Sequence, residues 1–273
     1  MATNLLKGKR GIIFGALNEE SIAWKTALMA HEEGAEFVLS NAPIALRMGK
    51  IKELGEACNA EVIAADATSV EDLENLFNKA SEILGGKIDF VLHSIGMSPN
   101  VRKGKTYGDL NYDWFHKTLD ISAMSFHKVL QTAEKLDVMN EWGSIVALSY
   151  IAAQRSFSHY ADMADAKALL ESVARGYGAR FAAKKVRVNT ISQSPTVTTA
   201  GQGITGFDDF FNFADQLSPL GNAPSEECAK YILSLFSDYT RYVTMQNLMH
   251  DGGFSTCGIT EEMMETLAKA RQK

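Results

Sequence analysis

Short apolar segments alternate with longer helical patterns along most of this 273-residue chain, and this alternation limits the possible folds more than any other feature. We expect strands over residues 11–14, 36–40, 61–65, 87–93, 143–149, 186–192 and 243–250. We expect helices over residues 21–33, 45–58, 69–84, 110–136 and 161–180. A strand–helix–strand series of this kind predicts an α/β fold, a doubly wound parallel sheet of Rossmann type with helices on both faces.

No break in the series suggests a domain boundary. No stretch rich in proline, glycine and serine divides it. The five prolines fall outside the expected strands and helices, at Pro43, Pro99, Pro195, Pro219 and Pro224. A chain of this length can bury a full core as one unit, so we expect a single domain over residues 1–273.

Composition excludes several classes of function. The net charge of -6 argues against nucleic-acid binding, which depends on clustered Lys and Arg. Cys58, Cys228 and Cys257 are widely separated and lie near no set of histidines, so we expect free thiols in a reducing compartment and no metal site. The N-terminal segment lacks a signal peptide's apolar core, and no stretch approaches the ~20 apolar residues that span a bilayer. We expect a cytoplasmic protein without a membrane or nucleic-acid partner.

Tyr160 and Lys167 are the residues that most directly indicate a reaction. Seven residues make nearly two helical turns, so the two side chains are expected on one face of the helix over 161–180. A neighbouring ammonium favours the phenolate and lowers a tyrosine pKa from ~10, which would make Tyr160 a poised acid. For this pair alone, an aromatic and a lysine on an amphipathic helix is the simpler interpretation; the upstream context, with a second tyrosine at Tyr150, favours chemistry.

A nucleotide site is expected where the strands end. Gly15 follows the first strand and Ser21 precedes the first helix, so the turn between them leads into a helix N-terminus that can bind a phosphate. The three-glycine dinucleotide fingerprint is absent, and as an isolated feature a simple strand-to-helix turn explains Gly15. Asp66 ends the third strand, where it could accept a hydrogen bond from an adenine amino group or cap the next helix. The segment over 93–96 ends the fourth strand, at the edge where open parallel sheets bind ligands.

The residues after the second strand bear on which cofactor is bound. Ser40 and Asn41 stand where an acid usually binds the NAD ribose, and no arginine adjoins them to hold a 2′-phosphate. Arg47 lies a few residues further on and could be recruited, or it could be a solvated helix residue. We expect NADH, with NADPH as the alternative.

Six motifs occur along the chain in one order. They are Gly15-x5-Ser21-Ile22-Ala23, His93-Ser94-Ile95-Gly96, Asp120-Ile121-Ser122, Ser149-Tyr150, Tyr160-x6-Lys167 and Asp251-Gly252-Gly253-Phe254. With these motifs the chain resembles the enoyl-acyl-carrier-protein reductases, divergent members of the short-chain dehydrogenase/reductase superfamily, from residue 5 to about 255. The resemblance implies the last reductive step of bacterial type II fatty-acid elongation, in which NAD(P)H reduces a trans-2-enoyl thioester carried by acyl carrier protein.

The resemblance also implies roles for individual residues. Tyr160 would stabilise the enolate, Lys167 would hold the nicotinamide ribose, and Tyr150 would line the acyl pocket. The residues implied to contact the dinucleotide are Gly15, Ser21, Ile22, Asp66, Ala67, Ser94, Ile95, Gly96, Ile121, Lys167, Pro195, Thr196 and Thr198. Those expected to bind substrate are Met97, Tyr150, Tyr160, Ile204 and Phe207.

Residues 196–217 form the segment with the weakest structural signal. They begin with glycines and end in an aromatic amphipathic stretch, so they are either a substrate-binding lid or an ordered core helix. Some relatives carry basic residues here to meet the acidic carrier protein, whereas this chain has Asp208 and Asp209. Arg102, Lys103 and Lys105 are the alternative docking candidates. By resemblance we also expect a homotetramer.

Two other functions fit the same residues. A carbonyl reductase of the same superfamily would protonate an alkoxide instead of stabilising an enolate. A nucleotide-sensing binding protein could keep the fold without turnover, although a pure binder has no need of a phenol and an ammonium at Tyr160 and Lys167.

Overall fold

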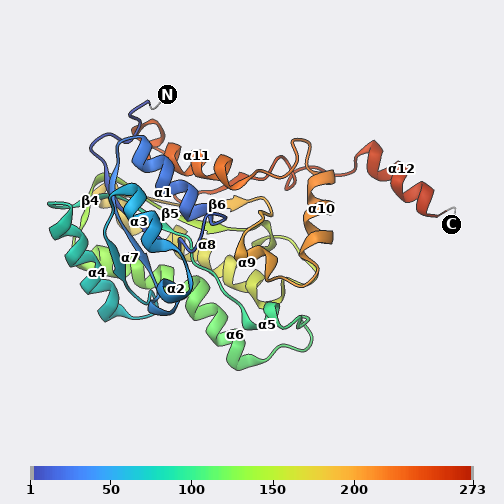
Figure 1. Cartoon of the computed structure of the whole chain (residues 1–273). Helices are drawn as coiled ribbons and strands as arrows, with labels where there is room; N and C mark the ends of the chain where they lie inside the picture. The colour runs from blue at the N-terminus through green and yellow to red at the C-terminus, as the bar shows by residue number, and fades with distance from the viewer. Residues whose placement is uncertain (1–2, 272–273) are drawn as a thin grey trace.

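A seven-stranded parallel sheet forms the centre of the protein (Figure 1). The computed structural model describes residues 3–271, so the first two and last two residues of the expected domain 1–273 lie outside the described residues. The strands are β1 (Arg10–Phe14), β2 (Glu36–Asn41), β3 (Val62–Ala64), β4 (Ile88–His93), β5 (Met139–Ser149), β6 (Arg187–Gln193) and β7 (Asn247–His250). They lie in the order β3-β2-β1-β4-β5-β6-β7, which confirms the doubly wound fold and places the topological switch point between β1 and β4.

Helices cover both faces of the sheet, as expected. One face packs against α1 (Ile22–Glu32), α3 (Ile51–Cys58) and α11 (Ser225–Phe236). The other packs against α4 (Val70–Ile83), α7 (Ser125–Lys135) and α8 (Ala161–Phe181). Successive strand residues alternate between the two cores, so Ile12 is buried on one side and Ile13 on the other.

The prediction of a single helix over residues 45–58 is wrong. The chain forms α2 (Pro43–Met48) and α3, separated at Gly49 and Lys50. A Cβ on Gly49 would lie 2.6 Å from the backbone oxygen of Leu17, and the Lys50 amide donates to that oxygen at 2.8 Å. Packing against the β1–α1 turn therefore sets the break.

Proline positions also differ from the expectation. Pro43 is the first residue of α2, and Pro99 is the first residue of α5 (Pro99–Arg102). A proline is tolerated there because its missing N–H would have no partner within the helix.

The bounds of three further elements differ from those expected from the sequence. The helix expected over 110–136 consists of α6 (Tyr112–Leu119) and α7, joined by a π-helical turn over Asp120–Met124. Strand β5 begins at Met139 rather than residue 143. Strand β7 begins at Asn247 rather than residue 243, because Met245 has a φ of 61° that interrupts the extended backbone.

Besides α5, four helices lie outside the segments that were expected to be helical. The stretch 196–217 contains α9 (Thr199–Gln202) and α10 (Phe207–Leu217), followed by α11. The last helix, α12 (Glu261–Ala270), has no buried residue and projects from the body of the molecule (Figure 1).

Among residues 3–271, no helix combines the length and apolar character needed to cross a bilayer. Cys58, Cys228 and Cys257 are free thiols, as expected.

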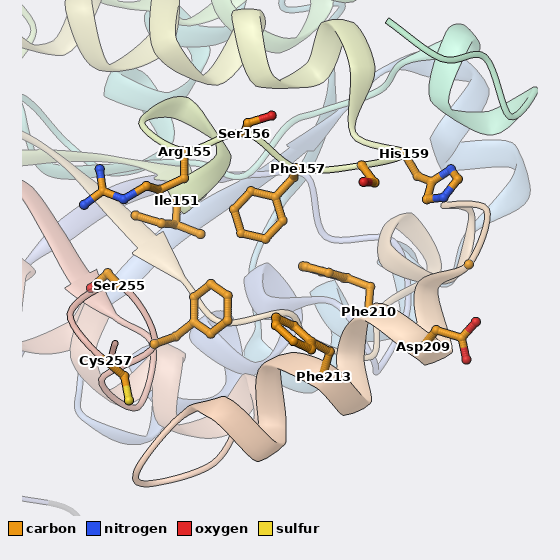
Figure 2. Close-up of a pocket in the computed structure, with 13 residues that line it drawn as sticks. Ile151, Arg155, Ser156, Phe157, His159, Asp209, Phe210, Phe213, Ser255 and Cys257 are labelled. Atoms are coloured by element: carbon orange, nitrogen blue, oxygen red, sulfur yellow. The ribbon is translucent and has the colours of Figure 1, made fainter. Parts of the chain in front are cut away.

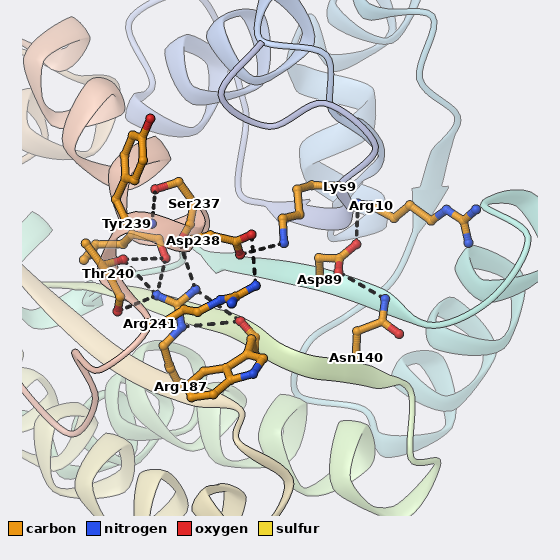
Figure 3. A network of polar contacts seen from close by, with 12 residues as sticks. Lys9, Arg10, Asp89, Asn140, Arg187, Ser237, Asp238, Tyr239, Thr240 and Arg241 are labelled. Carbon is orange, nitrogen blue, oxygen red and sulfur yellow. Dashed lines mark hydrogen bonds and ion pairs between the residues drawn. The ribbon is translucent and has the colours of Figure 1, made fainter. Parts of the chain in front are cut away.

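The amino-terminal edge of the sheet is occupied by a structural cluster around Arg187 (Figure 3). Arg187 begins β6 and is 2% exposed. Its guanidinium donates to the backbone oxygens of Leu235 at 2.8 Å, Thr240 at 3.0 Å and Trp142 at 3.2 Å. Burial lowers the Arg187 pKa to about 10. These acceptors join the end of α11 to the sheet, so the cluster serves the fold and leaves the opposite, carboxyl-terminal edge for a site.

Candidate active site

Gly15 is fixed by its contact with the end of β4. Its φ is 91°, and a Cβ there would lie 1.9 Å from the backbone oxygen of Ser94. Its amide donates to the Ser40 oxygen at 3.0 Å. The turn after β1 therefore lies against the ends of both neighbouring strands, at the switch point where a dinucleotide would cross the sheet.

Ser21 occupies the N-cap position of α1 but does not cap the helix. Its Oγ accepts from the amides of Leu17 and Asn18, both at 3.2 Å, and so holds the turn closed. Glu19, which brings negative charge close to the expected phosphate position, pairs with Lys50 at 2.8 Å. The hydrogen bond from Lys50 is the main reason that the Glu19 pKa is lowered.

Asp66 is exposed at the end of β3, and Ser69 is the residue that caps the following helix. One carboxylate oxygen of Asp66 accepts from Thr68, at 2.9 Å from the amide and 2.8 Å from the hydroxyl. The cap alternative for Asp66 is therefore wrong, and its other oxygen accepts no hydrogen bond from the described residues. Asn41, at the end of β2, donates to the Ala16 oxygen at 3.0 Å, so it braces the first turn.

The loop after β4 is braced by the π-helical turn. The Ser122 hydroxyl accepts from the Met97 amide at 2.9 Å and donates to the Met97 oxygen at 3.0 Å. Ser94, Ile95 and Gly96 are half-buried or exposed along the same loop. Ile121 comes from the turn itself, which explains how a residue far along the chain reaches this edge.

The remaining residues predicted to contact the cofactor differ in how deeply they are buried. Ile22 and Ala67 are buried in the two cores, so their backbone rather than their side chains can face a ligand. Pro195 is buried after β6, and Thr196 donates to the Ser194 oxygen at 2.9 Å. Thr198 caps α9 by accepting from the Gly201 amide at 3.0 Å.

Lys167 lies on the buried face of α8, and its side chain reaches the carboxyl-terminal end of β5. It is 8% exposed, and its ammonium donates to the Leu148 oxygen at 2.7 Å. A Cβ on Gly96 would lie 3.6 Å from Lys167 Nζ, so the ammonium adjoins the loop after β4. Burial lowers the Lys167 pKa to about 8, although the carboxylate of Glu171 opposes the shift.

Tyr160 is the residue before α8, where it pairs with Tyr150 from the end of β5. The two ring centroids are 5.1 Å apart. Burial raises the pKa of both phenols, and the Tyr150 hydroxyl is buried without a hydrogen-bond partner among the described residues. The expected lowering of the Tyr160 pKa by Lys167 is therefore wrong, because desolvation dominates. Tyr160 stays protonated at neutral pH and is a hydrogen-bond donor.

An aromatic cluster covers this tyrosine pair, and sequence reasoning missed most of it. Phe157 and Phe210 lie with ring centroids 5.5 Å and 5.9 Å from Tyr150, and Phe254 lies 5.9 Å from Phe157. Figure 2 shows the rings of Phe157 and Phe210 between α10 and the loop before α8. Aromatic residues at 157, 210 and 254 were the available signal, but nothing in their spacing indicates one site.

A cleft of about 600 Å³ opens on the outer side of this cluster (Figure 2). Arg155, His159 and Asp209 are among its lining residues, whereas Tyr160 and Lys167 are not. Next to Tyr160 there is a cavity of only about 20 Å³. That is room for about one water molecule, so the aromatic rings separate the open cleft from Tyr160.

Two residues of the 196–217 segment, Ile204 and Phe207, were predicted to bind substrate, and only Ile204 lies near the tyrosine pair. Ile204 packs with Tyr160 and lines the small cavity. Phe207 instead packs on Gly201 and on Phe211, whose ring centroid is 5.8 Å away. Phe210 lies three residues further along α10, and its ring makes the contact with Tyr150 that was expected of Phe207.

Within residues 3–271, no group of three or more His, Cys, Asp or Glu side chains could hold a metal ion. Two buried groups close to the site were also not anticipated. Glu171 accepts from Ser149 at 2.7 Å, so the proton of that hydroxyl is already engaged. Asp162 is completely buried in the first turn of α8.

Comparison with known proteins gives a consistent result. A family model described as "Enoyl-(Acyl carrier protein) reductase" matches residues 15–255. Enoyl-[acyl-carrier-protein] reductase [NADH] 1 of Rhizobium meliloti is 36% identical over 260 residues, covering 94% of this chain and 94% of that protein. The crystal structure of a FabI–NADH complex from Alistipes finegoldii has a TM-score of 0.95 and 65% identity, covering 96% of this chain and 93% of that one. An Aquifex aeolicus enoyl-[acyl-carrier-protein] reductase (NADH) structure has a TM-score of 0.86 and 32% identity, covering 94% and 100%.

Proposed function

Because the chain belongs to the enoyl-acyl-carrier-protein reductase family, we propose that Tyr160 and Lys167 carry out its chemistry, with Tyr150 beside them in the acyl site. The enzyme reduces the trans-2 double bond of enoyl thioesters with NADH, in the last step of the fatty-acid elongation cycle. The observation that supports these residue roles best is the tilted ring contact of Tyr150 with Tyr160, at the edge where Lys167 adjoins Gly96.

The residues at the switch point fit a dinucleotide. Gly15, Ser94 and Gly96 present backbone rather than bulky side chains along the open edge. Lys167 has one hydrogen-bond acceptor among the described residues, which leaves two of its three N–H groups for ribose hydroxyls. Asp66 would accept from the adenine amino group. The other proposed contacts are those of Ser21, Ile22, Ala67, Ile95, Ile121, Pro195, Thr196 and Thr198.

The protonation states of Tyr160 and Lys167 suit a hydrogen-bond donor at the developing enolate. When bound, NADH supplies the hydride that adds to the β-carbon of the enoyl thioester. Negative charge then develops on the thioester oxygen, and the protonated Tyr160 hydroxyl donates to it. Lys167 keeps its charge below about pH 8 and assists electrostatically from the cofactor side. Tyr150 presents its ring and its unpaired hydroxyl beside the reacting double bond.

The acyl chain would bind between the tyrosine pair and α10. Ile204 borders this space, and Phe210 replaces Phe207 as the proposed contact from the lid. Met97, on the loop after β4, stays a proposed substrate contact. The 20 Å³ cavity at Tyr160 is far too small for a thioester. Phe157 and Phe210 must therefore move apart when substrate enters from the outer cleft, which supports the lid interpretation of residues 196–217.

The enzyme's acyl substrate is carried by acyl carrier protein, for which we propose a docking surface. Arg102 ends α5, and Lys103 and Lys105 lie on the loop that follows. Arg102 Nε is 3.7 Å from where a Cβ on Gly203 would stand. The basic loop therefore meets the start of the lid, whereas Asp208 and Asp209 on α10 would repel an acidic partner. Charge reversal of Arg102 and Lys103 should raise the KM for enoyl-acyl-carrier protein but not for enoyl-coenzyme A. Equal KM changes for both would contradict this surface.

We propose a homotetramer in the cytoplasm. The exposed face of α8 carries small residues at Ala168, Ser172, Gly176 and Ala179, which would allow a second copy of the helix to approach closely across a two-fold axis. Light scattering at assay concentration tests the assembly, and a fully active monomer would contradict it.

The direct test of the catalytic roles is Tyr160→Phe. The variant should lose turnover of crotonyl-coenzyme A by roughly 100-fold while its Kd for NADH stays within about twofold, since the hydroxyl acts on the enolate. Tyr242→Phe is the matched control, because Tyr242 is 91% exposed and lies at the opposite edge of the sheet. Full turnover in Tyr160→Phe would remove the proposed donor.

A further inference from the structure

The backbone on both sides of Tyr160 is strained. His159 has a φ of 64° and Ala161 a φ of 40°, both in the left-handed region that residues with a Cβ rarely adopt. Ala161 is 5% exposed and packs with Val101, Met163 and Ala166, so solvent does not relax it. Strain of this kind persists only where the surrounding structure holds it in place.

Asp162, the next residue, supplies such a constraint. It is 0% exposed, and its carboxylate accepts from Ser98 Oγ at 2.6 Å and Asn100 Nδ2 at 2.8 Å. Thr118 Oγ1 is also 2.8 Å away, and it shares its single proton between this carboxylate and the Trp114 oxygen at 2.9 Å. No ion pair involves it within residues 3–271. A buried carboxylate without a cation is tolerated only when hydrogen bonds replace its water, so all three donors are needed.

These donors join three parts of the site. Ser98 and Asn100 belong to the loop and helix α5 that follow Gly96 and Met97, and Thr118 belongs to α6 just before the π-helical turn. Asn100 is itself held, because its Oδ1 accepts from the Asn111 amide at 3.0 Å. The carboxylate thus links the cofactor loop and α6 to a point two residues from Tyr160.

We propose that Asp162 is a positioning residue for the reduction: its three buried hydrogen bonds hold the strained turn at Ala161 and so fix the Tyr160 hydroxyl relative to the loop that carries Gly96. The proposal rests on the proposed role of Tyr160. Asp162 touches neither substrate nor cofactor and acts through the backbone of the turn.

Asp165 provides a matched control on the same helix. It lies one turn further along α8 and is half-buried. Among the described residues, the only hydrogen-bond partner of its carboxylate is the hydroxyl of the exposed Tyr107, at 3.4 Å. Asp162→Asn and Asp165→Asn are the same isosteric change. Only the first removes an acceptor that three donors share.

The test compares steady-state kinetics with NADH and crotonyl-coenzyme A on the full chain. In Asp162→Asn, kcat should fall about tenfold or more, while the KM for NADH stays within about twofold and the far-ultraviolet circular dichroism is unchanged. Asp165→Asn should stay within about twofold of the unchanged enzyme in both constants. Retention of kcat in Asp162→Asn, or an equal loss in Asp165→Asn, would overturn the proposal.

A second substitution separates positioning from simple stabilisation. Glycine adopts a φ of 40° freely, so Ala161→Gly removes the strain that the network must hold. The double variant Ala161→Gly with Asp162→Asn should recover kcat at least about threefold over Asp162→Asn alone. If Asp162 only stabilised the fold, the glycine would change the thermal midpoint without restoring kcat, and the positioning role would be abandoned.

Should Asp162→Asn fail to fold, Thr118→Val removes one donor while keeping the side-chain shape. It should lower kcat about threefold with the KM for NADH unchanged, and an unaltered kcat would overturn the proposal. The unchanged enzyme serves as the reference for the proposed function. If it does not oxidise NADH with crotonyl-coenzyme A, the assigned reaction fails, and that result is distinct from any result with the variants.

Discussion

The two proposed walls of the candidate active site are built differently. The wall proposed for the cofactor, here the cofactor wall, consists of Gly15, Ser94, Gly96 and Lys167 and depends on backbone contacts between neighbouring strand ends, with no space for a side chain at Gly15. The wall proposed for the acyl chain, here the acyl wall, consists of the aromatic rings of Tyr150, Phe157, Phe210 and Phe254. Phe157 and Phe210 pack edge to face on Tyr150, and Phe254 is tilted against Phe157, between a loop and the half-exposed helix α10. A wall of backbone is preformed, whereas a wall of side chains on a surface helix can open and close.

The largest expected effect is that of Gly15→Ala. A Cβ would overlap the Ser94 oxygen, and a φ of 91° is strained for alanine. We expect destabilisation by about 3 kcal/mol and an NADH affinity reduced by more than roughly 100-fold. Calorimetric unfolding and fluorescence titration with NADH measure both quantities.

Gly206→Ala is the matched change beside the acyl wall. Its φ of 76° is also left-handed, but no atom lies within 4 Å of its Cβ position. It should cost about 1 kcal/mol and leave NADH affinity unchanged. Equal effects of the two substitutions would remove the distinction between the walls.

Phe210→Ala should affect substrate and not cofactor. The phenyl ring contacts both Tyr150 and Phe157, so its loss takes apolar surface from the acyl site. We expect the KM for an enoyl thioester to rise roughly tenfold, with the Kd for NADH within about twofold. Leu220→Ala, at a residue 89% exposed, is the control and should change neither constant. An unchanged KM in Phe210→Ala would place the acyl chain elsewhere.

A smaller, several-fold effect is expected on the pH profile. Burial lowers the Lys167 pKa from 10.5 to about 8, so the folded protein loses this proton before the unfolded chain does. The cost of burying the ammonium is fully present below pH 8 and is relieved as the pH rises toward 10.5, so this group makes the protein more stable as pH increases through that window. The value of kcat/KM for NADH should instead fall above about pH 8, because the charge at the ribose is lost.

Lys167→Met identifies the group that titrates. Its kcat/KM should be low and should lack the decline above pH 8. The same decline in Lys167→Met would assign the titration to another residue.

The position of the cofactor wall could be predicted from the sequence because its residues lie where strands end, whereas their contact with the dinucleotide stays a prediction. Parallel strands bring their carboxyl ends to one edge, so locating the strands also located Gly15, Asp66 and the segment over 93–96. The reason for Gly15 could not be predicted, since its contact with Ser94 joins residues far apart in the chain. Asp66 likewise turned out to accept from Thr68 and not to cap a helix.

The acyl wall was largely beyond sequence reasoning. Phe207 and Phe210 lie on one helix, and which ring faces Tyr150 depends on how α10 docks. The pKa of Tyr160 was predicted in the wrong direction for the same reason, because burial by this wall outweighs the charge of Lys167. The turn at Ala161 and the buried Asp162 follow from tertiary packing that no local pattern encodes.

The most direct test of the contrast between the two walls is amide hydrogen exchange in three states: free protein, with NADH, and with NADH plus an acyl ligand. Residues over 10–16 and 88–93 should be strongly protected in all three states. Residues over 196–217 should exchange faster in the free protein, change little with NADH alone and slow markedly in the ternary complex. Equal, strong protection of both regions in the free protein would show that the acyl wall is as rigid as the cofactor wall, and would contradict the lid.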